Sequence, residues 1–125
     1  MKKTVLVAPM MDCTDRHDRY FLRLISKNVI LYTEMIVANA IIKGDKDFHL
    51  KFNLLEKPLA LQIAGSNPKE LAQATRIAAD YGYDEINLNL GCPSKKVQKN
   101  KFGACMMKEP NLVGDCITEM VNACN

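Results

Sequence analysis

Long hydrophobic runs are missing from this sequence, whose apolar stretches extend over only four to eight residues. A helix that crosses a membrane needs about 20 apolar residues, so we expect neither a membrane span nor a membrane partner. The apolar start at residues 4–8 is interrupted by Pro9 and followed by Asp12, and no small-residue cleavage site follows it. This start therefore predicts a buried strand and not a signal peptide.

Cysteine pairs are also missing, because the five cysteines are odd in number and contain no CxxC motif. They lie at Cys13, Cys92, Cys105, Cys116 and Cys124. This pattern argues against a disulfide framework and against a structural zinc site. We therefore expect no metal, and a reducing, cytoplasmic location.

The chain is too short for one class of fold and lacks the motifs of two others. A complete (β/α)8 barrel takes about 200 residues or more, whereas this chain has 125. Folding should still bury about two-thirds of the surface of the unfolded chain, which is enough for a core. No GxGxxG or GxxxxGKS/T motif follows a predicted strand, so a Rossmann fold and a phosphate-binding loop have no motif support.

Acidic residues are absent between Gly91 and Lys108, a segment that carries five lysines. The formal net charge is +3, and outside this segment twelve basic residues face fourteen acidic ones. All of the positive excess therefore lies on the segment, which is either a solvated loop or a phosphate-facing surface with salt-sensitive binding. Arg16 and Arg19 either extend such a surface or lie solvated on a helix.

Four short apolar runs recur at intervals of 26 to 28 residues. They cover residues 5–9, 30–34, 59–64 and 86–90. The runs are continuous, as in strands that are covered on both faces, and this favours parallel pairing. Strand and helix patterns alternate four times with a period close to that of a barrel unit. The pattern predicts an α/β fold of the TIM-barrel type, with a four-unit doubly wound sheet as the alternative.

Helical spacing of apolar residues appears between and after these runs. The three stripes are Tyr20, Phe21, Leu24 and Ile25; Leu71, Ala74, Ala78 and Tyr81; and Val113, Cys116, Ile117, Met120 and Cys124. Thr14 or Asp15 is expected to cap the first helix, and Asn67 the second. Residues 36–52 predict two helical pieces that Gly44 divides.

Polar amides mark the carboxyl ends of the predicted strands, where parallel α/β folds place their active sites. Gln62, Asn87 and Asn89 lie at two successive strand ends. A buried amide without a partner costs about 1–3 kcal/mol. Either a hydrogen-bond network in the core or a planar heterocyclic ligand supplies these partners, and amides on successive strands favour the ligand.

The stretch at residues 89–94, Asn-Leu-Gly-Cys-Pro-Ser, places the Cys92 thiol just beyond a strand on a Gly–Pro corner. An unperturbed thiol is protonated at neutral pH, so it can act as a general acid against a carbanion. The lysines that follow favour a thiolate as the alternative. Cys105 is the rival acid, and a core position is the simpler interpretation of the other three cysteines.

Six stretches occur in an order that resembles the tRNA-dihydrouridine synthases, specifically the subfamily that acts on D-loop uridines of the 20/20a class. They are residues 8–10 (APM), 14–17 (TDRH), 31–35 (LYTEM), 61–65 (LQIAG), 85–94 (EINLNLGCPS) and 102–105 (FGAC). A related Asn-x-x-Cys-Pro turn occurs in dihydroorotate and dihydropyrimidine dehydrogenases. A dihydroorotate-type flavin dehydrogenase is therefore a minor alternative.

The resemblance implies an FMN-dependent TIM barrel with a carboxyl-terminal helical domain that helps to hold tRNA. NADPH would reduce FMN, C6 of the uracil would receive hydride, and the cysteine would protonate C5. The target base must leave its stack for this chemistry. The implied roles are flavin contact for Pro9, Met10 and Met11, a hydrogen bond to the flavin ring for Gln62, proton donation for Cys92, proximity to the target base for Asn89, and phosphate contact for Lys95, Lys96, Lys99 and Lys101.

Two departures from the family pattern are visible. The family usually has a glycine in the stretch that here reads Lys99-Asn100-Lys101, and asparagine can replace glycine at a positive φ. In addition, residues 1–125 would be only the amino-terminal half of the catalytic domain, without the second half-barrel and the helical tRNA-binding domain. The alternative function is a non-catalytic half-barrel with residual RNA or partner binding. Open sheet edges near Val5 and Ile86 predict self-association.

Overall fold

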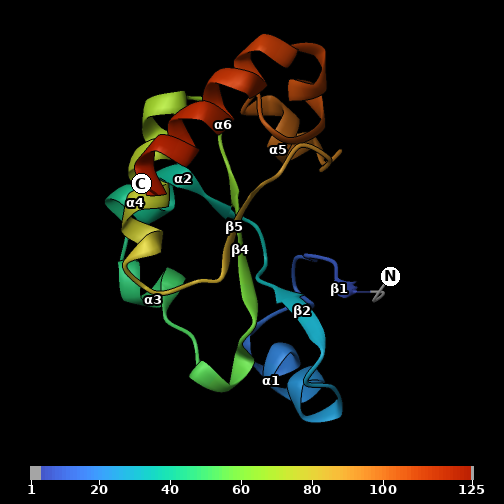
Figure 1. The fold of residues 1–125 in the computed structure, drawn as a ribbon. Helices are drawn as coiled ribbons and strands as arrows, with labels where there is room; N and C mark the ends of the chain where they lie inside the picture. Colours follow the sequence, from blue (N-terminus) through green and yellow to red (C-terminus); the bar gives the residue numbers. More distant parts are fainter. Residues whose placement is uncertain (1–3, 125) are drawn as a thin grey trace.

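The computed structural model describes residues 4–124, which form a parallel sheet and the helices that cover it (Figure 1). The strands are β1 (Val5–Val7), β2 (Val29–Tyr32), β3 (Ile36–Val37), β4 (Leu59–Ala64) and β5 (Glu85–Leu88). The α-helices are α1 (Arg16–Ile25), α2 (Ala38–Lys43), α3 (Lys46–Leu50), α4 (Pro68–Ala79), α5 (Lys95–Lys99) and α6 (Pro110–Cys124). Two 3₁₀ helices, η1 (Leu54–Glu56) and η2 (Gly103–Lys108), complete the described elements.

All strand pairs are parallel, and the sheet order runs from β1 through β2 and β4 to β5. The two-residue strand β3 pairs with the carboxyl end of β4, on the side where β2 pairs with its amino end. Each predicted apolar run overlaps a strand, whereas the sequence pattern does not predict β3. Within residues 4–124, β1 pairs only with β2 and β5 only with β4. This is the strand–helix arrangement of a TIM-barrel-type fold, and the barrel is not closed.

The two faces of the sheet differ in character because side chains alternate along each strand. Leu61 and Ile63 of β4 point to the helical side and pack with α4 and α6 in one buried cluster. Helices α2, α4 and α6 lie side by side there (Figure 1). Gln62 and Asn87, in register on β4 and β5, share the opposite face. The apolar core therefore lies between sheet and helices, and the polar strand ends face away from it.

Capping side chains fix the helices where the sequence predicts them. The Asp15 carboxylate accepts hydrogen bonds from the backbone N–H groups of His17 and Asp18, at 2.9 Å each, and caps α1. The bond from the Asp18 N–H is the main reason that the pKa of Asp15 lies below its ordinary value. Asn67 caps α4 in the same way. None of the helices described between residues 4 and 124 is long and apolar enough to span a bilayer.

Helix α1 has its apolar stripe on the outside, although the helix lies where it was predicted. Phe21, Leu24 and Ile25 are all more than half exposed, whereas Arg19 and Arg23 are buried. The expectation of a surface or solvated role for Arg19 is therefore wrong. The reason is that α1 packs against η1 through its arginines. Arg19 and Arg23 both bond Glu56 of η1, while the apolar stripe stays exposed.

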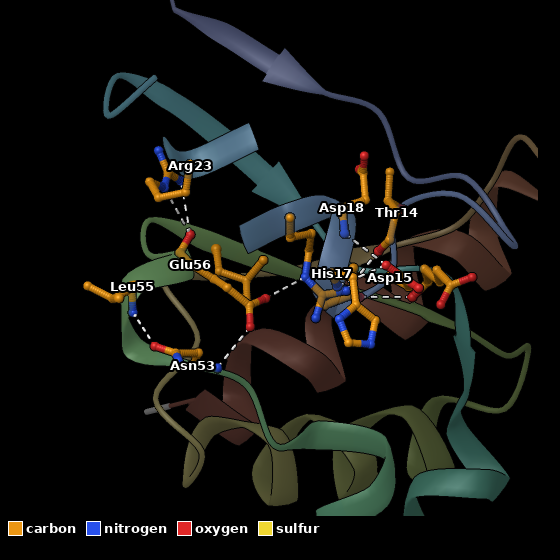
Figure 2. A network of polar contacts seen from close by, with 12 residues as sticks. Thr14, Asp15, His17, Asp18, Arg23, Asn53, Leu55 and Glu56 are labelled. Atoms are coloured by element: carbon orange, nitrogen blue, oxygen red, sulfur yellow. Dashed lines mark hydrogen bonds and ion pairs between the residues drawn. The ribbon is translucent and has the colours of Figure 1, made fainter. Parts of the chain in front are cut away.

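The buried arginines join α1 to the segment before β4, and Figure 2 shows Arg23 beside Glu56. Arg19 Nε lies 2.6 Å from Glu56 Oε2, and the two side chains are 8% and 2% exposed. Arg23 donates to the backbone oxygens of Glu56 and Pro58, at 2.9 Å each, and to that of Val29 at 2.8 Å. The other Glu56 carboxylate oxygen accepts the N–H of Asn53 at 2.8 Å. These bonds hold the first β/α unit against the amino end of β4.

Candidate functional site

A cavity of about 880 Å³ opens at the carboxyl ends of the strands. Most of the site residues expected from the sequence line it, namely Pro9, Met10, Met11, Gln62, Asn89, Cys92 and Lys96. They come from the segments after β1 and β5 and from β4 itself, so the parallel sheet brings together residues that are up to 87 positions apart in the sequence. The volume is within the range of ligand pockets, about 300–1,000 Å³. The cavity is therefore the candidate active site.

The remaining lysines of the predicted set lie on one side of the cavity, in and after α5, and do not line it. Lys95 and Lys99 are exposed on α5, and Lys101 is exposed in the loop that follows. Helix α5 lies beyond the carboxyl end of β5 (Figure 1) and is capped by Ser94, whose hydroxyl accepts the N–H of Val97 at 3.2 Å. The positive charges therefore form a rim beside the cavity.

The three amides form a connected network on the cavity wall. Gln62 Nε2 donates to Asn87 Oδ1 and Asn89 Nδ2 donates to Gln62 Oε1, each over 2.9 Å. The backbone N–H of Gln62 donates to the Thr33 hydroxyl at 3.1 Å. The amides thus satisfy one another in part, as a core network would. Gln62 and Asn89 each keep one side-chain N–H that the network does not use, and Asn87 keeps both. The wall can therefore also bind a ligand.

A second polar pair lies on the same face of the sheet, toward the amino end of β5. The hydroxyl of Tyr32 donates to Glu85 Oε1 at 2.8 Å. Burial, together with this bond, raises the pKa of Tyr32. Tyr32 and Glu85 flank Ala60 across β4 in the strand register, two residues before the Gln62–Asn87 pair. The face that a closed barrel would turn inward therefore carries two successive polar layers.

Cys92 is half-buried in the turn after β5, and hydrogen bonds hold the turn from both sides. Asn89 Oδ1 accepts the N–H of Cys92 at 3.0 Å and that of Gly91 at 3.3 Å. The N–H of Ala104 donates to the Cys92 carbonyl at 3.0 Å. Since both backbone polar groups of Cys92 are bonded, the thiol retains mainly rotation about its Cα–Cβ bond. This geometry suits a group that must deliver a proton to one position.

Cys105, the rival acid, lies outside the lining of the cavity. Its thiol donates to the Phe102 carbonyl at 3.1 Å, within the backbone that leads into η2. Phe102 is buried and itself lines the cavity. The contact gives Cys105 a local role in holding η2, so the positions of the two thiols favour Cys92 as the proton donor.

The loop between α5 and η2 departs from the expectation for Asn100. Asn100 has φ −93°, and it is Lys101 that adopts a positive φ, of 60°. The reversal of the chain therefore takes place one residue later, at a lysine, where the left-handed conformation costs about 1–2 kcal/mol. The expected substitution of asparagine for glycine at a positive φ is wrong for this loop.

Gly103 is a residue that the sequence analysis does not single out, yet it packs directly against the turn that contains Cys92. Its φ is +70°, and a Cβ there would lie 2.7 Å from the Cys92 carbonyl oxygen and 2.6 Å from Cγ1 of Val97. The Phe-Gly-Ala-Cys stretch marks this glycine in the sequence, but the stretch does not show that the glycine packs against Cys92 and Val97. Met35 and Val37 also line the cavity, and they were missed because β3 is so short.

Replacing Gly103 with alanine should lower the free energy of unfolding by about 2–3 kcal/mol, because the new Cβ meets backbone at a positive φ. Urea unfolding followed by circular dichroism measures this change. Gly114→Ala is the matched control, since nothing lies within 4 Å of a Cβ there and alanine favours a helix. Equal stability of Gly103→Ala and the parent chain would show that the loop does not pack under Cys92 as described.

Within the described part of the chain, no three His, Cys, Asp or Glu side chains lie together as a metal site would need. The polar side chains of the cavity are instead amides, one thiol, one hydroxyl and a lysine. Such a set offers an organic ligand hydrogen bonds, together with protons that the thiol or the ammonium group can transfer. The apolar side of the cavity, with Pro9, Met10 and Met11, offers contact area for a flat ring.

Comparison with known proteins agrees with this chemistry. The family model described as "Dihydrouridine synthase (Dus)" matches residues 6–125. A tRNA-dihydrouridine(20/20a) synthase of Shewanella oneidensis is 55% identical over 120 residues, which cover 96% of this chain and 36% of the relative. Those of Vibrio vulnificus and Pseudomonas aeruginosa are 59% and 54% identical, over 91% and 94% of this chain and 35% of each relative.

This chain thus spans about a third of the length of the curated relatives that it matches. The match nevertheless runs through nearly the whole chain and includes the stretch that contains Cys92. The chain belongs to the dihydrouridine synthase family.

Proposed function

We propose that the chain supplies the flavin-facing part of a tRNA-dihydrouridine(20/20a) synthase, an FMN-dependent, NADPH-linked enzyme that reduces the C5=C6 bond of a D-loop uridine. Dihydrouridine synthases are flavin-dependent oxidoreductases that act on uridine in tRNA. The observation that carries the proposal is that Cys92, Gln62 and Met10 line one cavity. Residues 1–125 then form the amino-terminal half of the catalytic barrel.

The cavity fits a flavin ring in two respects. Its apolar wall includes Met10 and Met11, each more than half exposed and so available for contact with a ring. Its polar wall offers the unused N–H groups of Gln62 and Asn87 to the oxygen and nitrogen atoms at the edge of the ring. FMN, when bound and kept reduced by NADPH, supplies the hydride that C6 of the uracil receives.

Cys92 completes the reduction by donating its proton to C5. Hydride at C6 and a proton at C5 together saturate the double bond, and the thiolate that remains takes a proton from solvent. General acids contribute about 10²–10⁴-fold to a rate. The hydrogen bonds that hold the Cys92 backbone keep the thiol in the position that this contribution needs. A thiol that rotated freely with its loop would be in reach of C5 for only part of the time.

Asn89 and the lysine rim bind the tRNA in this proposal. Two backbone N–H groups occupy Asn89 Oδ1, so the side chain can offer a uracil carbonyl only its remaining N–H. Lys95, Lys96, Lys99 and Lys101 are exposed beside the cavity mouth, where they contact phosphates with a salt-dependent affinity. A tRNA substrate and free cysteines are consistent with a cytoplasmic location.

Mass spectrometry of tRNA nucleosides tests the proposal. Unmodified tRNA is incubated with NADPH and with protein that has been reconstituted with FMN and separated from free flavin. Retained flavin and dihydrouridine at positions 20 or 20a support the function. Colourless protein that cannot be reconstituted with FMN would favour the non-catalytic half-barrel for this chain. Reduction of the C5=C6 bond of a free pyrimidine to the dihydro form, with no change in tRNA, would favour the dihydroorotate-type dehydrogenase.

The open sheet edges support the expected self-association of the isolated chain. Val5 and Leu6 of β1 are 59% and 55% exposed, and nothing in residues 4–124 pairs with the outer edge of β1 or β5. Exposed strand edges pair readily with other chains. We expect dimers or larger species in light scattering at micromolar concentration, and a single monomeric species would contradict this expectation.

A further inference from the structure

Asn89 follows β5 and forms a bridge between the Cys92 turn and the wall of the cavity. Its backbone N–H donates to the Ile63 carbonyl at 2.8 Å, so the residue is anchored to β4. Its side chain then reaches in two directions, toward the turn through Oδ1 and toward Gln62 through Nδ2. Asn89 therefore supports the backbone around the cavity as well as lining the cavity.

The hydrogen-bonding capacity of the Asn89 amide is almost used up within the protein. An amide oxygen accepts two hydrogen bonds, and the N–H groups of Gly91 and Cys92 supply both. Of the two Nδ2 protons, one is donated to Gln62 Oε1 at 2.9 Å. Three of the four possible bonds therefore fix the protein itself. A residue that served only to contact a substrate would leave most of these positions open.

We propose that Asn89 is a positioning residue, which locks the backbone of Cys92 to the amide of Gln62 so that proton donor and flavin contact move as one unit. The roles of Cys92 as proton donor and of Gln62 as flavin contact rest on the proposed function. The coupling itself rests on the bonds from Cys92 to Asn89 and from Asn89 to Gln62. It spans the carboxyl ends of β4 and β5, the two strands that form the polar wall of the cavity.

The N–H groups of the turn depend on the Asn89 side chain, whereas the Pro93 carbonyl is held by Gln98 Nε2 at 2.7 Å. Gly91 is exposed, and a Cβ built on it meets nothing within 4 Å. Pro93 has no N–H to donate. The Ala104 N–H holds the Cys92 carbonyl from the side of η2. Among residues 4–124, Asn89 alone accepts the N–H groups of Gly91 and Cys92.

Two substitutions at Asn89 and one at Asn87 together separate the hold on the turn from the rest of the network. Asn89→Ala removes the acceptor for the turn and the donor to Gln62 together. Asn89→Asp keeps the acceptor, since an aspartate oxygen can take the same two N–H groups. The second carboxylate oxygen then faces Gln62, whose amide can turn over and donate to it while Asn87 turns to donate in its place. Asn87→Ala is the matched control, because it removes the far end of the network and leaves the turn intact.

Amide hydrogen exchange in the isotope-labelled chain tests the hold on the turn. We expect the Cys92 amide to exchange about tenfold faster in Asn89→Ala, as the loss of one hydrogen bond implies. In Asn89→Asp and in Asn87→Ala its exchange rate should stay within about twofold of the parent rate. The amide of Leu61 in β4 is the internal reference for global unfolding. Equal protection of Cys92 in Asn89→Ala and the parent chain, or equal loss in Asn87→Ala, overturns the proposal.

Alkylation of Cys92 by iodoacetamide, resolved by peptide mass spectrometry, gives a second measurement if Asn89→Ala unfolds. The carboxylate of Asn89→Asp lies against the turn and disfavours the thiolate, so the midpoint of the pH profile at Cys92 should move to higher pH. The profile at exposed Cys13 should not move. An unshifted Cys92 profile in Asn89→Asp overturns the proposal. Failure of the parent chain to bind FMN would overturn the proposed function and leave both measurements unchanged.

Discussion

Replacing Cys92 with alanine should abolish dihydrouridine formation by an enzyme of the relatives' full length, while flavin stays bound. The expected loss is about 10²–10⁴-fold in turnover, the usual contribution of a general acid. The side chain is small and half-buried, and the two backbone bonds of Cys92, to Asn89 and Ala104, survive the change. The cavity therefore keeps its shape. Mass spectrometry of tRNA nucleosides gives the turnover, and the visible absorption spectrum gives the flavin content.

Cys105→Ala is the matched control for this experiment. The Cys105 thiol donates to the Phe102 carbonyl and lies outside the cavity lining. Its loss removes one local contact, so turnover should fall by less than about threefold, as for a weak hydrogen bond. If Cys105→Ala abolishes turnover and Cys92→Ala does not, the assignment of the proton donor is wrong.

The second large effect is expected at Glu56, where alanine should lower the free energy of unfolding by about 3–5 kcal/mol. Glu56 is 1% exposed and is the ion-pair partner of Arg19, which lies 2.6 Å away. Removal of the carboxylate leaves the Arg19 guanidinium buried without a counter-charge. Since small domains have a total stability of about 5–15 kcal/mol, the loss should be plain in urea unfolding at pH 7.

Lys57→Ala offers a control one residue along the chain. Lys57 and Asp84 form an ion pair of 3.4 Å in which both side chains are more than a third exposed. Exposed pairs contribute about 0–1 kcal/mol, so this variant should be nearly as stable as the parent. Replacing Arg19 and Glu56 together with leucine should recover most of the stability that Glu56→Ala loses, because no unpaired charge remains. Equal effects of Glu56→Ala and Lys57→Ala would contradict the buried pair.

The sequence allowed prediction of the features that depend on local patterns. Four strands could be located because they are continuous apolar runs at a regular spacing, and β4 is buried along its whole length. Helix α1 could be placed because Asp15 caps it. Cys92 and Gln62 could be assigned to one site because parallel strands bring their carboxyl ends to the same edge, and both line the cavity.

Features that depend on distant partners could not be predicted. Arg19 has the pattern of a surface arginine on a helix, and its burial depends on Glu56, 37 residues later. Strand β3 pairs with β4 over only two residues, too few to give a pattern. The closeness of Gly103 to Cys92 depends on the backbone angles of the loop between them, in which Lys101, and not Asn100, has the positive φ.

The most direct test of the account is a titration of the isotope-labelled chain with millimolar FMN, followed by nuclear magnetic resonance. We expect the shifts to concentrate on the cavity, at Met10, Met11, Gln62, Gly91 and Cys92. A separate groove between α1 and α3, lined in part by Asp47, Phe48 and Asn53, should stay unchanged. Shifts confined to that groove, or none at Gln62 and Cys92, would contradict the account.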